Sequence, residues 1–213
     1  MIAVENRIVL DQWISIIWDE FVTIADFPQS EKLKSYYYNG RMRQELMSTG
    51  SDHSTDHGIL ISLIFLFATL RAIPLRCKDG CSYRKTGITE FQPDVSYYVG
   101  DRFDLVPRGV RVIDLDLYPL PDLVIEVSDT SLADDKSQKM ALYQVLGIAE
   151  YWILDVQNSK LLAFAIGAGG EIREICESVI IPGFKFDLID QALQMNLTQD
   201  QSAIGSWFMS QCI

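Results

Sequence analysis

Cysteine and histidine are scarce in this sequence, which contains four cysteines and two histidines among 213 residues. Cys77 and Cys81 lack the spacing of a zinc knuckle, and no second pair of cysteines completes a tetrahedral site. We therefore expect reduced, structural cysteines and no structural zinc. A chain of this length buries a sizeable hydrophobic core without disulfides or metal.

Long hydrophobic runs are also missing. The N-terminal residues show no basic start followed by an apolar stretch, the pattern of a secretory signal peptide. The longest apolar run, residues 58–70, is shorter than the roughly 20 residues that a membrane-spanning helix needs. We expect a cytoplasmic protein that has no membrane partner.

Positive charge is in deficit, with a formal net charge of −11. Such a balance argues against a protein that coats nucleic acid without sequence preference, because coating depends on many cationic side chains. The cations are unevenly distributed, however. A denser group lies in residues 71–85, and such a run is most often a solvated face.

The most informative stretch is residues 121–155, which predicts a strand, an amphipathic helix and a second strand. Glu126 interrupts the apolar run of the first strand, on the same face as Asp122 and Val124. A buried lone carboxylate is costly and needs a partner. Lys136, Lys139 and the tyrosine four residues further are candidates on the following helix, either for a structural ion pair or for a functional site.

The rest of the chain alternates between strand and helix patterns, which predicts a single α/β domain. An Asn-Gly hairpin turn is expected at 39–40, followed by a helix that is capped by Ser54 and runs to residue 70. Further expected elements are helices at 10–25 and 186–195, and strands at 81–84, 91–99, 151–156, 160–166 and 171–177. We divide the chain into a helical segment at 1–34 packed on the core, a main domain at 35–195 and a tail at 196–213.

The two histidines lie four residues apart, at His53 and His57. This spacing could place both on one face of a helix and let them share a metal ion. His53 precedes the expected helix cap, however, and no glutamate completes an HExxH motif. A role in a loop or a first helical turn is the favoured interpretation.

Two carboxylates and a lysine form a constellation that suits metal-assisted chemistry. Asp94 follows Pro93 at the start of one predicted strand, and Glu126 lies within another. If the two strands are neighbours, both carboxylates could bind a hard cation such as Mg²⁺. A lysine beside them could orient water and stabilise developing negative charge, which suits cleavage of a phosphodiester.

At these residues the sequence resembles the PD-(D/E)XK nuclease superfamily, and more closely the Uma2 family of restriction endonuclease-like bacterial proteins. The matching pieces are NGRMRQELMS at 39–48, QPDVSYYVG at 92–100 and the whole block at 121–156. The resemblance covers about residues 35–190, and the last block is its most specific part. It implies a restriction endonuclease-like fold, a mixed central β-sheet flanked by helices.

The resemblance also implies roles for individual residues. Asp94 corresponds to the first metal-binding carboxylate and Glu126 to the acidic residue of the second half-motif. Ser128 stands where the superfamily pattern has its lysine. In Uma2-like sequences the following helix supplies this lysine in a Lys-x-x-x-Tyr pattern, which Lys139 matches.

Three further residues remain candidates. Glu45 corresponds to an acidic residue that similar proteins carry after the early glycine, where it would be a third metal ligand or orient a water. Asp122 follows a proline as well, but it lies on the same strand as Glu126, so we keep it as a helper. Lys136 is the rival to Lys139, without a tyrosine four positions on.

The leading hypothesis is therefore a nuclease dependent on Mg²⁺ or Mn²⁺, an endonuclease that hydrolyses phosphodiester bonds. Nucleic acid, with DNA preferred, is the expected substrate, and a homodimer is left open. The alternative is a non-catalytic binding or assembly module that retains the fold, which the negative net charge favours. Hydrolysis of a smaller phosphoester is a third reading.

Overall fold

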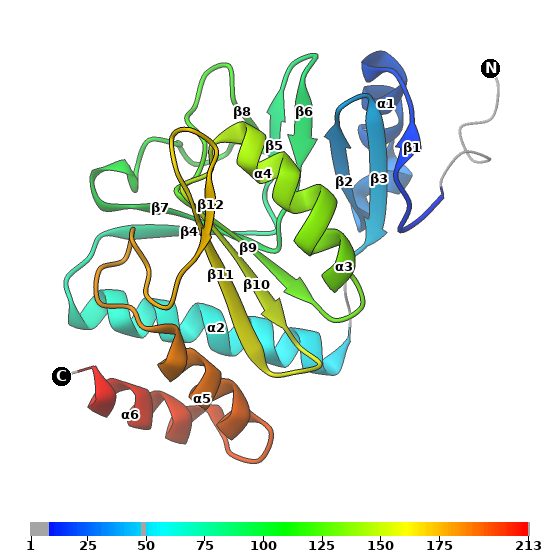
Figure 1. Cartoon of the computed structure of the whole chain (residues 1–213). Coiled ribbons are helices and arrows are strands. Elements are labelled where there is room, and N and C mark those ends of the chain that lie inside the picture. Colours follow the sequence, from blue (N-terminus) through cyan, green and yellow to red (C-terminus); the bar gives the residue numbers. More distant parts are fainter. Residues whose placement is uncertain (1–8, 48–49, 213) are drawn as a thin grey trace. The chain divides into compact units, whose positions relative to one another are not determined.

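The computed structural model describes residues 9–47 and 50–212 (Figure 1). The chain divides into two compact units, each assembled from separate segments. One unit contains the described residues of 1–48 together with 80–93 and 106–119. The other contains the described residues of 49–79 and 120–213 together with 94–105. The first is called unit 1 and the second unit 2.

Unit 1 is built on a six-stranded mixed sheet in the order β1-β3-β2-β6-β5-β8. All pairs of neighbouring strands are antiparallel except β5 and β8, which are parallel. Its strands are β1 (Ile14–Ser15), β2 (Leu33–Tyr38), β3 (Arg41–Leu46), β5 (Ser82–Lys85), β6 (Thr89–Phe91) and β8 (Val112–Asp114).

The predicted hairpin at the start of this sheet is confirmed. Strands β2 and β3 pair in antiparallel register, with Tyr38 opposite Arg41. Asn39 and Gly40 connect them with φ values of 50° and 70°. Positive φ at both central residues is what a type I′ turn requires, and Asn-Gly tolerates it well.

The first predicted helix is shorter than expected. The helix α1 spans Trp18–Ala25, and the preceding Ile14–Ser15 forms β1 against β3. The helical prediction over 10–17 was wrong because apolar spacing alone did not reveal the pairing partner on β3. Phe21 and Ile24 of α1 pack on Tyr37 and Met42 in a small hydrophobic cluster. A 3₁₀ turn, η2 (Pro28–Lys32), then leads into β2.

Unit 2 contains a second six-stranded mixed sheet, in the order β12-β11-β10-β9-β7-β4. Strands β9 and β10 are parallel, and the other neighbours are antiparallel. The strands are β4 (Leu75–Asp79), β7 (Val95–Val99), β9 (Leu123–Ser128), β10 (Glu150–Asp155), β11 (Lys160–Ile166) and β12 (Ile172–Glu174).

Helices cover both faces of this second sheet (Figure 1). On one face, α2 (Ser51–Leu70), α5 (Phe186–Asn196) and α6 (Gln201–Gln211) pack on apolar side chains such as Ile125 and Trp152. The other face carries the continuous helical segment formed by α3 (Leu132–Asp134), the π-helical turn η4 (Asp135–Lys139) and α4 (Met140–Leu146). A short 3₁₀ turn, η3 (Gly100–Arg102), follows β7. The prediction of a mixed α/β fold with flanking helices is confirmed. The strands are divided between two sheets.

Helix α2 begins at Ser51, with Gly50 as its N-cap and no side-chain capping hydrogen bond, so the predicted cap at Ser54 was wrong. It is the one helix of the described ranges that is long and apolar enough to cross a membrane by length and composition alone. Its Leu60, Leu63 and Ile64 are fully buried on the sheet. Burial of apolar side chains against a sheet is typical of a helix in a protein core.

Pro93 divides what looked like a single strand at 91–99. Strand β6 ends at Phe91 in the sheet of unit 1, and β7 begins at Val95 in the sheet of unit 2. Proline has no backbone N–H to donate to a neighbouring strand, so the strand is interrupted at this proline. The tail beyond residue 196, for which no structure was predicted, contains α6, capped by the carboxylate of Asp200.

Phe184 tests the core of unit 2. Its ring stacks on Trp152 at 5.6 Å and meets Phe67 edge-on at 5.1 Å, and the residue is 1% exposed. We expect Phe184→Ala to lower the free energy of unfolding by about 3–5 kcal/mol, measured by chemical denaturation, because it leaves a cavity. Phe65→Ala is the control, since Phe65 is 60% exposed and should cost less than about 0.5 kcal/mol. Equal losses would contradict this description of the core.

Candidate active site

Asp94 and Glu126 come from neighbouring strands of the same sheet. Strands β7 and β9 are antiparallel, with Val95 opposite Ile125. Continuing this register by one residue places Asp94, which immediately precedes β7, opposite Glu126. The Asp94 carboxylate also accepts a hydrogen bond from the backbone N–H of Val127 at 2.8 Å. The condition that the two strands be neighbours is therefore met.

The carboxylate of Glu126 meets its predicted partners on the following helix. The Tyr143 hydroxyl donates a hydrogen bond to Glu126 Oε1 at 2.6 Å, and Lys139 Nζ lies 3.5 Å from Glu126 Oε2. Glu126 and Lys139 are each 1% exposed, whereas Lys136 is exposed. Between the two candidate lysines, Lys139 is the one that faces the carboxylate.

Asp135 completes this network and was missed in the sequence. Its Oδ1 lies 2.9 Å from Lys139 Nζ, closer than the glutamate does, and its Oδ2 accepts a hydrogen bond from the Ser131 hydroxyl. Asp135 is fully buried. The pair Asp134-Asp135 looks like a solvated acidic face, and the four-residue spacing from Asp135 to Lys139 was the signal that could have found it.

The helix that carries these groups is locally widened. Asp135 begins and Lys139 ends the π-helical turn η4, between the α-helical turns of α3 and α4. Single π-helical turns inside α-helices are uncommon and occur often at functional sites. Here the turn brings both of its buried charged residues to the strand side of the helix.

Tyr151 on β10 closes the network from the sheet. Its hydroxyl donates a hydrogen bond to the backbone carbonyl of Asp135 at 3.0 Å. Burial, followed by the negative charges of Asp135 and Glu126, raises the pKa of Tyr151 well above its ordinary value. The phenol therefore stays protonated and keeps donating at neutral pH.

The two histidines of α2 face different carboxylates. His53 Nε2 lies 3.7 Å from Asp94 Oδ1, and His57 Nε2 lies 3.5 Å from Asp79 Oδ1. Both residues lie in the first two turns of the helix, so the favoured first-turn placement holds for His53. Within residues 9–47 and 50–212, no three His, Cys, Asp or Glu side chains gather as a metal-binding group.

Asp122, the candidate helper, is occupied elsewhere. Its carboxylate accepts hydrogen bonds from the Val99 backbone N–H at 2.9 Å and from Arg102 at 2.6 Å. These contacts hold the η3 turn against the start of β9. We interpret Asp122 as a structural residue on that basis.

Glu45 belongs to unit 1. It lies on β3 opposite Lys34 of β2, is 8% exposed and accepts a hydrogen bond from Arg43 at 2.6 Å. Its role as a metal ligand or in orienting a water stays a prediction.

Comparison with known proteins supplies the family. The sequence profile of Uma2, described as "Putative restriction endonuclease", matches residues 18–184. The chain belongs to the Uma2 family. Among solved structures, it is similar to a protein from Anabaena variabilis ATCC 29413 described as a putative nuclease belonging to DUF820. The TM-score is 0.54 at 19% identity, with 91% of this chain and 99% of that chain covered. No curated protein matches.

The comparisons confirm the predicted family and fold. The match in sequence extends from α1 to Phe184 and so includes both proposed carboxylates and Lys139. At 19% identity, the structural similarity concerns the fold alone. The assignment of individual residues rests on the geometry of this chain.

The donor atoms of this Uma2 protein suit a hard divalent cation. Asp94 and Glu126 offer carboxylate oxygens from facing positions, and Mg²⁺ prefers oxygen ligands while it keeps several waters. Two carboxylates are a common protein contribution to such a site. The residues present thus fit Mg²⁺ or Mn²⁺ by donor chemistry.

Lys139→Met tests whether this lysine balances the buried carboxylates. The substitution keeps much of the volume but leaves Glu126 and Asp135 without the ammonium group. We expect the free energy of unfolding to fall by about 3–5 kcal/mol in chemical denaturation, because uncompensated buried charge is costly. Lys136→Met is the matched control on the exposed side of the helix and should change little. A similar small effect of both substitutions would show that the buried pair is not a determinant of stability.

Proposed function

We propose that this protein is a nuclease dependent on Mg²⁺ or Mn²⁺ that hydrolyses phosphodiester bonds of nucleic acid. The observation that carries the proposal is the buried contact between Lys139 and Glu126, with Asp94 on the facing strand position. An aspartate, a glutamate and a lysine from three elements are the residue types that metal-assisted hydrolysis of a phosphodiester uses.

Asp94 and Glu126 would hold the cation. Once bound, Mg²⁺ would polarise a water molecule and neutralise charge on the scissile phosphate. Asp94 is oriented for this by the Val127 N–H, and Glu126 by the Tyr143 hydroxyl. Both carboxylates are therefore held in place by donors from rigid elements.

Lys139 would supply positive charge beside the phosphate and orient the attacking water. Asp135 at 2.9 Å and Glu126 at 3.5 Å hold its ammonium group between them. In this arrangement Asp135 is a positioning residue, which acts through the lysine. Glu45 is proposed to assist, as a further ligand or by orienting water.

The family supports the class of reaction, because its description reads "Putative restriction endonuclease". We infer a nucleic acid substrate, with DNA preferred, and a cytoplasmic location. The main domain at 35–195 and the homodimer stay predictions.

A non-catalytic module is the second candidate function. Glu126, Asp135 and Lys139 are each at most 1% exposed, and the ammonium group of Lys139 contacts both carboxylates, as in a purely structural network. The same three groups would then stabilise the contact between η4 and β9 without meeting a substrate. Activity measurements separate the two functions.

Cleavage assays test the catalytic assignment. We expect single- or double-stranded DNA to be cut with Mg²⁺ or Mn²⁺ and protected by a chelator. Asp94→Ala, Glu126→Ala and Lys139→Ala should each lower the rate at least about a hundredfold, because each removes a ligand or a charge that acts in the transition state. Lys136→Ala should retain the wild-type rate.

Two controls accompany the assay. Circular dichroism establishes that each variant is folded at the assay temperature. Lys139→Arg keeps the positive charge at this position but changes its geometry. RNA substrates run in parallel define the type of nucleic acid. Absence of cleavage by the wild type, or survival of activity in all three alanine variants, would exclude these residues as a nuclease site.

Metal binding provides a test that does not need turnover. Calorimetric titration with Mn²⁺ should show a saturable site, weakened at least about tenfold by Asp94→Asn or Glu126→Gln, because an amide is a poorer ligand than a carboxylate for a hard cation. Asp129→Asn controls for nonspecific attraction to this acidic protein. Unchanged affinity in the first two variants would place any bound ion elsewhere.

A further inference from the structure

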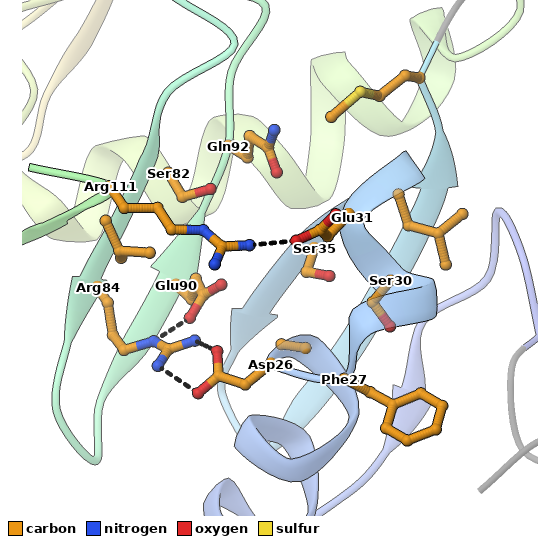
Figure 2. Close-up of a pocket in the computed structure, with 14 residues that line it drawn as sticks. Asp26, Phe27, Ser30, Glu31, Ser35, Ser82, Arg84, Glu90, Gln92 and Arg111 are labelled. Carbon is orange, nitrogen blue, oxygen red and sulfur yellow. Dashed lines mark hydrogen bonds and ion pairs between the residues drawn. The ribbon is translucent and has the colours of Figure 1, made fainter.

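Unit 1 contains a cavity of about 550 Å³ that the proposed nuclease function does not use. Its walls come from the end of α1, from η2 and from strands β2, β5, β6 and β8 (Figure 2). Small-molecule sites usually have volumes of about 300–1,000 Å³. The cavity is therefore large enough for a ligand of nucleoside size.

The floor of the cavity is one face of the first sheet. Directly paired residues lie on the same face, which places Tyr37, Glu90 and Arg84 in one row across β2, β6 and β5. Helix α1 covers the apolar end of this face at Tyr37. Beyond the helix, the face becomes polar, with Ser35, Ser82 and Gln92 at the cavity.

This polar floor is buried. Ser35, Glu90 and Gln92 are 5%, 4% and 7% exposed. Buried polar groups are costly unless hydrogen bonds satisfy them. Gln44, paired with Ser35 across β2 and β3, donates to the Ser35 hydroxyl, while its own buried Oε1 has no hydrogen-bond partner. Such a floor has the capacity to bind a ligand through hydrogen bonds.

The charged side chains of the cavity form ion pairs with one another. Arg84 pairs with Glu90 and, through two nitrogens, with Asp26, and Arg111 reaches across to Glu31 (Figure 2). Two arginines and three carboxylates leave a net charge of −1 when all are ionised. Burial raises the pKa of Glu90, although Arg84 opposes this effect. An anionic group such as free phosphate is disfavoured in these surroundings.

A nucleobase matches this combination of groups. It is neutral, planar and carries hydrogen-bond donors and acceptors along one edge. Carboxylate and amide side chains such as Glu90 and Gln92 pair with such edges, and an arginine guanidinium plane can stack on the ring. The apolar side chains of Leu33, Met47 and Val112 also line the cavity and offer contact to a ring face.

We propose that the cavity of unit 1 is a binding site for one unstacked nucleobase, either of a free nucleoside or within a single strand. The mouth can adapt to entry, because Arg111 and Glu31 have side chains 82% and 64% exposed, and exposed ion pairs of this kind contribute little to stability. This site goes beyond the proposed catalysis and needs neither the metal nor the carboxylates of unit 2.

The test is titration of the full chain with adenosine, guanosine, cytidine and uridine in the presence of a chelator, followed by NMR chemical shifts. At least one nucleoside should bind saturably and shift the signals of Ser35, Glu90 and Gln92. D-ribose and inorganic phosphate are comparison ligands that should not compete. Short single-stranded and double-stranded DNA distinguish a base within a strand from a free nucleoside.

Two variants alter the cavity. Ser82→Tyr fills it from β5 and should weaken binding at least tenfold, while Gln92→Leu removes an amide and should weaken it about fivefold, the loss of roughly one hydrogen bond. Lys85→Tyr is the matched control, because Lys85 lies on the opposite face of the same strand and should change the affinity less than twofold. Circular dichroism verifies folding, and Gln92→Leu serves if Ser82→Tyr fails to fold.

Each result of the titration either supports or overturns the proposed nucleobase site. The proposal is overturned if no nucleoside binds, if the shifted signals lie outside the cavity, if ribose or phosphate competes, or if the cavity variants bind like the wild type. Because the titration contains no divalent cation, a failure here leaves the nuclease proposal unaffected. Loss of cleavage activity, conversely, would not change the expected nucleoside binding.

Discussion

The interaction on which unit 2 depends is the neutralisation of a carboxylate in the middle of a buried strand. Glu126 is enclosed between its own sheet and the helix that follows it, where an isolated charge would be too costly to bury. Lys139 and Tyr143 compensate it, and Asp135 in turn compensates the lysine. These contacts join the helix to the sheet.

The same buried contacts affect both the stability of unit 2 and the proposed catalysis. Groups that balance one another in a dry interior are costly to separate, and they are also fixed in direction and distance, which favours catalysis. Asp94 enters the same region from the end of a different strand, set there by the proline before it. The protein thus brings metal-binding residue types together with little conformational freedom left to them.

Much of unit 2 could be predicted because its signals are local. The apolar run around Glu126, the helical spacing that follows it and the second strand all agreed with the structure. The resemblance to Uma2 proteins, through their Lys-x-x-x-Tyr pattern, indicated Lys139. Asp135 could not be predicted with the same ease, because an acidic pair on a helix usually faces water. Only the π-helical turn and the packing on β10 bury it.

Two of the wrong predictions share one cause, the pairing of strands that lie far apart in the chain. Residues 14–15 have helical spacing but form a strand because β3 offers an edge, and residues 91–99 contribute to two sheets and not to one. Neither partner can be identified from a local pattern, since strand pairing joins residues far apart in the chain.

The sequence by itself determined the mixed α/β class, since periodicity is a property of short segments, and its resemblance to Uma2 proteins indicated the family and the residues of the candidate site. Tertiary structure alone decided that Asp135 lies against Lys139, that Asp122 is bound by Arg102, and that a polar cavity lies on the first sheet. These features depend on strand register and burial. Both arise only when distant segments pack together.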